Sequence, residues 1–124
     1  MTEARLRTGR IGEELACERL ISAGLRILAR NCRTRAGEID VVCLDRGTLV
    51  FVEVKTMRTG TRGGPERPEL AVGPRKQLQV RRLARAWLAE AAPPRYGSIR
   101  FDVVGVLLSP TGTAAGINHI QDAF

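Results

Sequence analysis

The stretch GEIDVVCLDRGTLVFVEVK, residues 37–55, decides how this chain folds. Two apolar runs, residues 38–44 and 49–54, flank a short segment whose glycine, Gly47, favours a tight turn. The pattern predicts a β-hairpin. Both faces of the two strands are largely apolar, which indicates an interior hairpin that is covered on both sides.

The turn sets the register of this hairpin. With the turn centred on residues 46–47, Leu44 pairs with Leu49. Counting back along both strands then places Asp40 opposite Glu53. Because side chains alternate between the faces of a strand, one predicted face carries Asp40, Val42, Leu44, Leu49, Phe51, Glu53 and Lys55, and the other carries Ile39, Val41, Cys43, Val50, Val52 and Val54.

Two carboxylates and a lysine are thus expected at one end of a buried face. Like charges on opposed strand positions destabilise a sheet, and removing them from water adds to the cost. A divalent cation offsets this cost, since carboxylate oxygens suit Mg2+ or Mn2+. The Lys55 ammonium can stabilise charge on a phosphate or help to deprotonate an attacking water. The alternative is a hairpin end at the surface, where Lys55 simply neutralises Asp40 and Glu53.

The remaining sequence predicts two helices and further strands around this hairpin. Glycines bound the first helix, and Gly73-Pro74 opens the second, which Pro93-Pro94 stops. The predicted elements are, in order, a helix at 9–24, strands at 25–33, 38–44 and 49–54, a long connection at 56–73, a helix from 74 to about 91, and then one or two strands, at 99–108 and, as a candidate, at 117–120. This order predicts one α/β domain over residues 1–124, with a mixed central sheet flanked by helices.

Arginine dominates the charge of the chain. Lys plus Arg number 20 against 13 acidic residues, which gives a net charge of +7, and Lys55 and Lys76 are the two lysines. The guanidinium fork matches two phosphate oxygens at once. The composition therefore favours a polyanionic partner, nucleic acid. The alternative is a composition bias that merely keeps the protein in solution.

The sequence also limits compartment and chemistry. No apolar run approaches the length of a membrane span, and the N-terminus lacks the apolar core of a secretory signal, so we expect a cytoplasmic protein with no membrane partner. Cys17, Cys32 and Cys43 are odd in number and have no metal-binding spacing, which indicates buried free thiols. No Ser/His/Asp set, Walker loop or zinc-ligand spacing occurs in the sequence.

Two motifs carry a resemblance to a known family. GEID at residues 37–40, followed by VFVEVK at residues 50–55, resembles the PD-(D/E)xK signature of restriction-endonuclease-like nucleases, with Ile39 in place of the proline. More closely, the chain resembles, over nearly its full length, the YraN family of small predicted endonucleases, distant relatives of archaeal Holliday junction resolvases. The segments that carry this resemblance are residues 9–13, 31–33, 37–40, 50–55, 76, 100–104 and 119–124.

The resemblance implies a restriction-endonuclease-like αβββαβ core and Mg2+-dependent hydrolysis of phosphodiester bonds in DNA, including branched or structured DNA. It implies that Asp40, Glu53 and the Val54 carbonyl bind Mg2+ or Mn2+ and that Lys55 is the catalytic lysine. Resolvases of related fold work as dimers, so a homodimer is expected. The alternative is a non-catalytic nucleic-acid-binding or assembly module that keeps the nuclease fold.

Glu13 is a further candidate for the catalytic and metal site. With about 100° of rotation per residue, it lies on the same side of the first predicted helix as Leu20, flanked by Ala16 and Cys17. A glutamate on the core side of a helix is unusual, and the resembled superfamily often supplies an acidic residue from this helix. We expect Glu13 to ligate a metal or water; an edge position or a salt bridge to Arg33 is the alternative.

Basic residues bracket the acidic hairpin and predict a phosphate backbone running across it. The predicted nucleic-acid-binding residues are Arg30, Arg33, Arg35, Arg58, Arg62, Lys76 and Gln77. Lys76 and Gln77, at the start of the second helix, are placed where they could reach the active site or a phosphate. The alternative is that the arginines are solvated surface charges and that Lys76 and Gln77 belong to a solvated first turn of the second helix.

Three other residues are assigned to structure or to no role. Trp87 is expected in the core. Asp102 is expected to be structural and to face Arg100 or an arginine of the first helix. His119, a lone histidine, is expected to be incidental.

Overall fold

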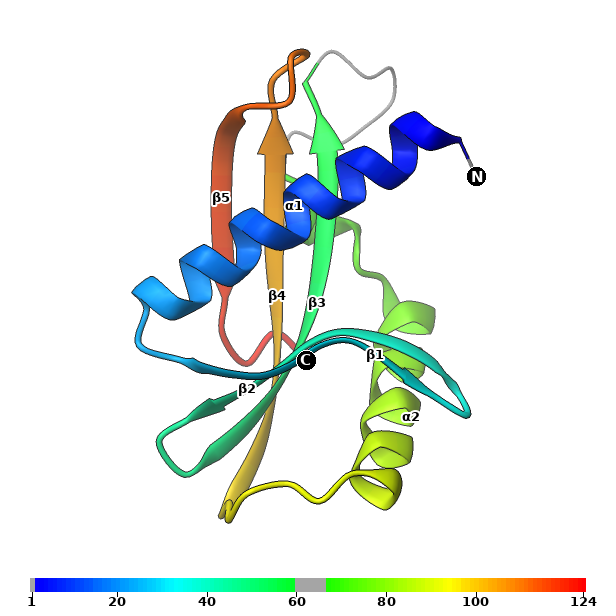
Figure 1. Ribbon diagram of the computed structural model, residues 1–124, viewed down its shortest axis with the longest axis vertical. Coiled ribbons are helices and arrows are strands. Elements are labelled where there is room, and N and C mark those ends of the chain that lie inside the picture. Colours follow the sequence, from blue (N-terminus) through cyan, green and yellow to red (C-terminus); the bar gives the residue numbers. More distant parts are fainter. Residues whose placement is uncertain (1, 60–66) are drawn as a thin grey trace.

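The computed structural model describes residues 2–59 and 67–124 (Figure 1). Its elements are α1 (Glu3–Ser22), β1 (Arg26–Thr34), β2 (Gly37–Asp45), β3 (Thr48–Arg58), the 3-10 helix η1 (Pro68–Ala71), α2 (Pro74–Glu90), β4 (Ser98–Leu108) and β5 (Ala114–Ile120). The strands form one sheet in the order β1-β2-β3-β4-β5, in which β3 and β4 are parallel and the other neighbours antiparallel. This confirms the predicted α/β class, and the order is consistent with an αβββαβ core.

The two helices cover opposite faces of the sheet, which makes three layers (Figure 1). On one face, α1 packs Ala16, Cys17 and Leu20 against apolar side chains of β2, β3 and β4. On the other face, α2 packs Leu83, Ala84 and Trp87 against β2 and β3. Trp87 meets the Phe51 ring edge-on at 5.7 Å between ring centroids, so its predicted place in the core is confirmed. Neither helix of the described residues is long and apolar enough to span a bilayer.

One face assignment was wrong, because Ile39 packs with Val42 in the α2 core and not with Val41 in the α1 core. Side chains of β2 therefore stop alternating regularly between the two faces of the sheet at Asp40. On the neighbouring strand, Asn31 adopts a φ of 48°, and the pairing skips from Arg30↔Val41 to Cys32↔Ile39. This local distortion turns Ile39 to the opposite face.

Several element boundaries also differ from the predicted ones. Helix α1 begins at Glu3 and not at residue 9, because the Thr2 side chain caps it by accepting a hydrogen bond from the Arg5 amide at 3.3 Å. Strand β3 extends to Arg58, since β4 pairs with it along its whole length. The predicted connection at 56–73 therefore includes the end of β3 and η1, and its residues 60–66, with Arg62, lie outside the described residues.

Gly12 allows α1 to lie close to β3. A Cβ atom at this position would overlap the Thr56 side chain, whereas a Cβ at Gly9, one turn earlier, would meet nothing within 4 Å. Gly12→Ala should therefore destabilise the fold by about 1–3 kcal/mol, the usual cost of overpacking. Gly9→Ala should stabilise it by up to about 1 kcal/mol, since alanine is the better helix former. Urea unfolding of both variants measures the difference, and equal gains in stability would contradict the close packing.

Candidate active site

The candidate site lies where β2 separates from β3. The hairpin has the predicted register, from Leu44↔Leu49 to Val41↔Val52, and the pairing ends there. Beyond this point β3 continues beside β4 alone, as far as Arg58↔Leu108. Asp40 and Glu53 are the next residues past the last pair. The carboxylate of Asp40 accepts a hydrogen bond from the Val54 amide at 2.9 Å, which takes the place of a sheet hydrogen bond that β2 no longer supplies.

Asp40 and Glu53 lie close together as predicted, and each affects the pKa of the other. Burial, reinforced by the nearby charge of Glu53, raises the pKa of Asp40 to about 7. Burial also raises the pKa of Glu53, an effect that Lys76 opposes. The ionised pair is therefore costly in the absence of a further positive charge.

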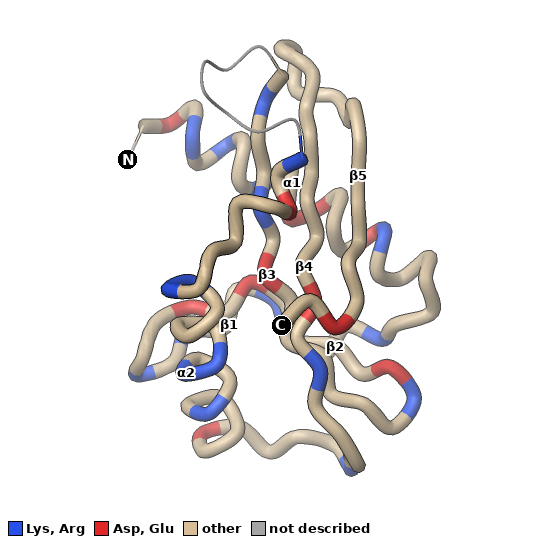
Figure 2. The backbone as a smooth tube through the Cα atoms, turned by 180° about the vertical axis from the view of Figure 1, so that it is seen from behind, with Lys and Arg blue, Asp and Glu red and all other residues tan. Residues whose placement is uncertain are grey.

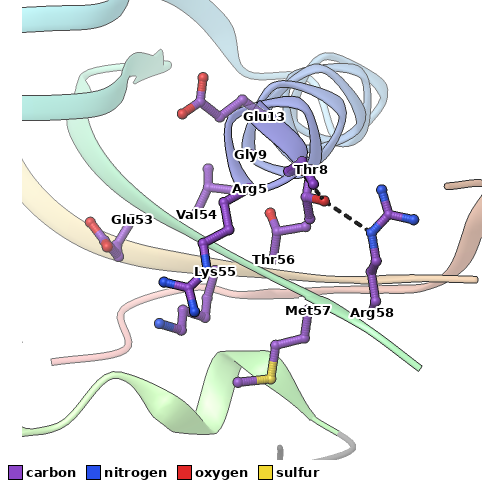
Figure 3. Close-up of a pocket in the computed structure, with 11 residues that line it drawn as sticks. Arg5, Thr8, Gly9, Glu13, Glu53, Val54, Lys55, Thr56, Met57 and Arg58 are labelled. Atoms are coloured by element: carbon purple, nitrogen blue, oxygen red, sulfur yellow. Dashed lines mark hydrogen bonds between the residues drawn. The ribbon is translucent and has the colours of Figure 1, made fainter. Parts of the chain in front are cut away.

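Two ammonium groups belong to this site, and they are those of the two lysines of the chain. Lys76, in the first turn of α2, lies with its Nζ 3.3 Å from the Glu53 Oε1. Lys55 projects from β3 on the same side as Glu53, whereas Val54 and Thr56 point toward α1 (Figure 3). The prediction that Lys76 reaches the acidic site is confirmed.

Glu13 approaches the pair from α1 but does not join it. Its side chain is close enough to Asn31 and Asp40 for both to affect its pKa, and the alternative of a salt bridge to Arg33 does not form. Burial and the charge of Asp40 raise the pKa of Glu13. Within residues 2–59 and 67–124, no three acidic, histidine or cysteine side chains converge tightly enough to hold one ion. Direct ligation by Glu13 thus stays a prediction, and its observed place is beside the pair.

A groove of about 600 Å³ opens beside these residues, between the N-terminal half of α1 and the free edge of β3 (Figure 3). Its lining includes Glu13, Glu53 and Lys55, and Arg5 and Arg58 bring positive charge to it. The site is thus reached from solvent and has positive charge beside its acidic pair. A groove of this kind suits an anionic substrate better than a neutral one.

The remaining predicted nucleic-acid-binding residues have different surroundings. Arg30 forms an exposed ion pair with Glu14 at 2.8 Å. Arg58 donates to the Thr8 hydroxyl and to the Pro110 carbonyl, both at 2.9 Å. Gln77 donates a hydrogen bond to the Val72 carbonyl at 3.1 Å. Its side chain therefore binds the segment that precedes α2 and does not reach the acidic site. Arg33 and Arg35 are exposed, on β1 and on the β1–β2 turn.

Asn31 was missed in the sequence as a residue of the site, although it lies near Glu13 and lowers its pKa. Its signal is conformational, because asparagine is one of the few residues that readily adopts the left-handed region. The distortion at Asn31 lies beside Asp40 on the neighbouring strand. The distortion thus lies at the point where β2 stops pairing with β3.

Asp102 has the structural role that was predicted, and His119 has a role that was not. Asp102 is 0% exposed, and it accepts hydrogen bonds from Arg100 at 2.8 and 3.0 Å, from His119 at 2.8 Å and from the Asp122 amide at 3.0 Å. The His119 side chain is 5% exposed. The expectation that His119 is incidental was therefore wrong, since this imidazole links β5 to a buried carboxylate of β4.

The cysteines agree with the predicted free thiols. Cys17 and Cys43 are buried, Cys32 is half-buried, and all three are unpaired. Burial raises the pKa of each, that of Cys43 to about 12. These thiols are accordingly protonated and unreactive at neutral pH.

Comparisons with known proteins give one family. The sequence profile described as "Uncharacterised protein family UPF0102" matches residues 12–106. A UPF0102 protein of Streptomyces griseus subsp. griseus is 49% identical over 109 residues, which cover 88% of this chain and 89% of the relative. A UPF0102 protein of Syntrophus aciditrophicus is 45% identical over 119 residues, covering 96% and 89%. The UPF0102 protein FRAAL5785 of Frankia alni is 49% identical over 116 residues, covering 94% and 92%.

Proposed function

The chain belongs to the UPF0102 family, and from the geometry of its acidic pair we propose that it is a metal-dependent nuclease that hydrolyses phosphodiester bonds in DNA, including branched or structured DNA. The observation that carries the proposal is the contact between Asp40 and Glu53 at the point where β2 leaves β3. The resemblance of GEID and VFVEVK to the PD-(D/E)xK signature supports the same assignment.

The residues present fit a hard divalent cation. Asp40 and Glu53 are two close carboxyl groups, one of them with a pKa raised to about 7, so a further positive charge at this position would stabilise the ionised pair. Two carboxylates, completed by water and substrate phosphate, are a common donor set for Mg2+. Asp40 and Glu53 would hold the ion, Mg2+ or Mn2+, and the Val54 carbonyl is the further ligand that the resemblance implies. When bound, such an ion supplies Lewis-acid stabilisation of phosphate charge and a more acidic water.

The other residues of the site have roles that follow from their positions. Lys55 projects beside Glu53, where its ammonium offsets charge on a phosphate or orients an attacking water (Figure 3). Lys76 offsets the charge of Glu53 in the structure, and beside a bound cation its ammonium would be available to a substrate phosphate. Glu13 lies close enough to Asp40 for their charges to interact, so its carboxylate is a candidate further acceptor at the site.

The proposal predicts that purified protein cleaves DNA only with Mg2+ or Mn2+ and that Lys55→Ala loses this activity. The expected loss in rate is at least about 100-fold, the lower range for removal of a positioned acid–base or charge-stabilising group. Supercoiled, branched and single-stranded DNA are the substrates, and a chelator should abolish cleavage. Arg19→Ala, an exposed arginine in the last turn of α1, is the control and should cleave normally.

The outcome that contradicts this proposal favours the alternative function. Wild-type protein that binds DNA without cleaving it under Mg2+ or Mn2+, with binding unchanged in Lys55→Ala, would indicate a non-catalytic nucleic-acid-binding or assembly module. The homodimer and the cytoplasmic location stay predictions, and light scattering of the purified protein tests the first.

A further inference from the structure

Helix α2 carries a row of arginines that the site does not use. Its 17 residues include five basic side chains and one acidic one, Glu90. Figure 2 shows these basic positions along the helix. Two of them are engaged: Lys76 binds Glu53, and Arg81 lies over the Phe101 ring at 4.6 Å. The other three, Arg75, Arg82 and Arg85, are exposed and form no ion pair or hydrogen bond with any described residue.

Arg75 and Arg82 lie on the outer surface of α2. They are seven residues apart, which places them about 20° apart around the helix and about 10 Å apart along it. The inner side of α2 is occupied by Val80, Leu83 and Trp87, which are buried against the sheet. A shallow groove of about 890 Å³ follows the first turns of the helix, and its lining includes Arg75, Lys76 and Arg82.

Lys76 links this groove to the candidate active site. The ammonium of Lys76 touches Glu53, and the same residue lines the groove beside Arg75. An anionic chain lying along α2 would therefore lead directly to the acidic pair. Strands of nucleic acid carry one phosphate per about 3.4 Å of duplex length, so the distance from Arg75 to Arg82 spans about three phosphates of one strand.

The chemistry of the groove favours nucleic acid over a lipid surface. A membrane-binding amphipathic helix must present an apolar face to the bilayer, but the apolar face of α2 is buried in the core. Leu78 is the large hydrophobic side chain of α2 that is exposed to solvent, at 60%. Guanidinium groups in a row match phosphate oxygens by bidentate hydrogen bonds.

We propose that Arg75 and Arg82 form a phosphate-binding surface that holds one strand of nucleic acid beyond the bond that is cut. The proposal rests on the nuclease function and names its substrate class more closely: a polymer that extends several nucleotides to one side of the reacting phosphate. A dinucleotide, which cannot reach from the acidic pair to Arg82, is then a poor ligand and a poor substrate.

The test measures DNA binding without metal, so that it does not depend on catalysis. Fluorescence anisotropy of a labelled DNA duplex over a range of salt concentrations gives the affinity and its salt dependence. Arg75→Ala with Arg82→Ala should weaken binding at least about tenfold at low salt and reduce the slope of log K against log salt by about 2, one unit per lost phosphate contact. The matched control, Arg19→Ala with Arg95→Ala, removes the same charge from exposed positions outside α2 and should leave the slope unchanged.

The outcomes separate this proposal from the nuclease function. Reduced slope in the α2 variant supports the surface even if wild-type protein never cleaves DNA. Equal slopes in the α2 variant and the control overturn it, even if cleavage by wild-type protein is normal. A poly-glutamate peptide that binds wild-type protein as tightly as the duplex, and loses affinity in the α2 variant, also overturns it by showing that the groove takes acidic protein. Unchanged thermal unfolding of both double variants is required for these comparisons, and arginine to alanine on a helix surface carries no helix-propensity penalty.

Discussion

Asp40→Asn is expected to abolish metal-dependent cleavage while making the metal-free protein more stable at about pH 8. The loss of cleavage should exceed about 100-fold, since removing even an outer-shell partner of a metal site costs 10- to 100-fold. The gain in stability arises because asparagine keeps an oxygen for the Val54 amide but carries no charge beside Glu53. The protein would thus gain stability from the substitution that inactivates it.

The dependence on pH identifies the cause. The pKa of Asp40 is about 7 in the folded protein, above its ordinary value of 3.8. A carboxyl group of this kind favours the fold when protonated, so its contribution is fully present below about pH 4 and is lost as the pH rises through 7. Relative to wild type, Asp40→Asn should therefore gain about 2–4 kcal/mol at pH 8, and the gain should disappear below about pH 4.

Thermal unfolding of metal-free protein across this pH range measures the effect. Asp45→Asn is the matched control, because Asp45 is on the same strand but forms an ion pair with Arg100 at 3.0 Å. It should cleave DNA normally and lose up to about 1 kcal/mol of stability. A loss of stability for Asp40→Asn at every pH would show that the charges of the acidic pair do not destabilise the fold. It would remove the main support for a metal site.

Asp102→Ala should destabilise the protein by about 3–5 kcal/mol, the range for breaking a buried ion pair from one side. Asp102 is fully buried and accepts two hydrogen bonds from Arg100, whose side chain is 17% exposed. Alanine leaves this guanidinium without its buried counter-charge and leaves His119 and the Asp122 amide without an acceptor. Urea unfolding gives the change in free energy.

A second ion pair of the same length provides the comparison. Arg30 and Glu14 are also 2.8 Å apart, but their side chains are 41% and 61% exposed, so Glu14→Ala should cost less than about 1 kcal/mol. Burial alone would raise the pKa of Asp102, but hydrogen bonds from His119 and Arg100 outweigh it, and the net shift is downward. Its contribution to stability is hence present above about pH 4 and declines as the pH falls through the lowered pKa, so the difference between wild type and Asp102→Ala should shrink in acid. Equal costs for the two substitutions would contradict the role of Asp102.

The hairpin could be predicted because its information is local. Gly47 sets the turn, alternation sets the faces, and together they bring Asp40 to Glu53 without reference to any other part of the chain. The same reasoning failed at Ile39, because the distortion that turns this residue over lies on another strand, at Asn31. The alternating pattern of one strand holds no information about a distortion in the strand beside it.

Contacts between distant residues were the least predictable part of the site. His119 reaches Asp102 only because β5 pairs with β4 in the register that sets His119 beside Val104, and no local pattern encodes that pairing. The arginines of α2 were visible in the sequence, but which of them would be free and which engaged depended on the places of Glu53, Phe101 and Phe124 in the fold. The start of the second helix gave Lys76 and Gln77 the same prospect of reaching the site, but in the fold Lys76 reaches Glu53 and Gln77 binds the Val72 carbonyl.

The placement of both lysines at Glu53 has a practical consequence for chemical modification. Reagents and enzymes that acylate lysine side chains can act on this chain at Lys55 and Lys76 and at no other side chain. Acetylation would replace each ammonium with a neutral amide and so withdraw the positive charge that now balances the carboxylates. Covalent attachment to a sensor chip through lysine side chains would likewise anchor the molecule at its candidate site, whereas capture through an added affinity tag leaves both lysines free.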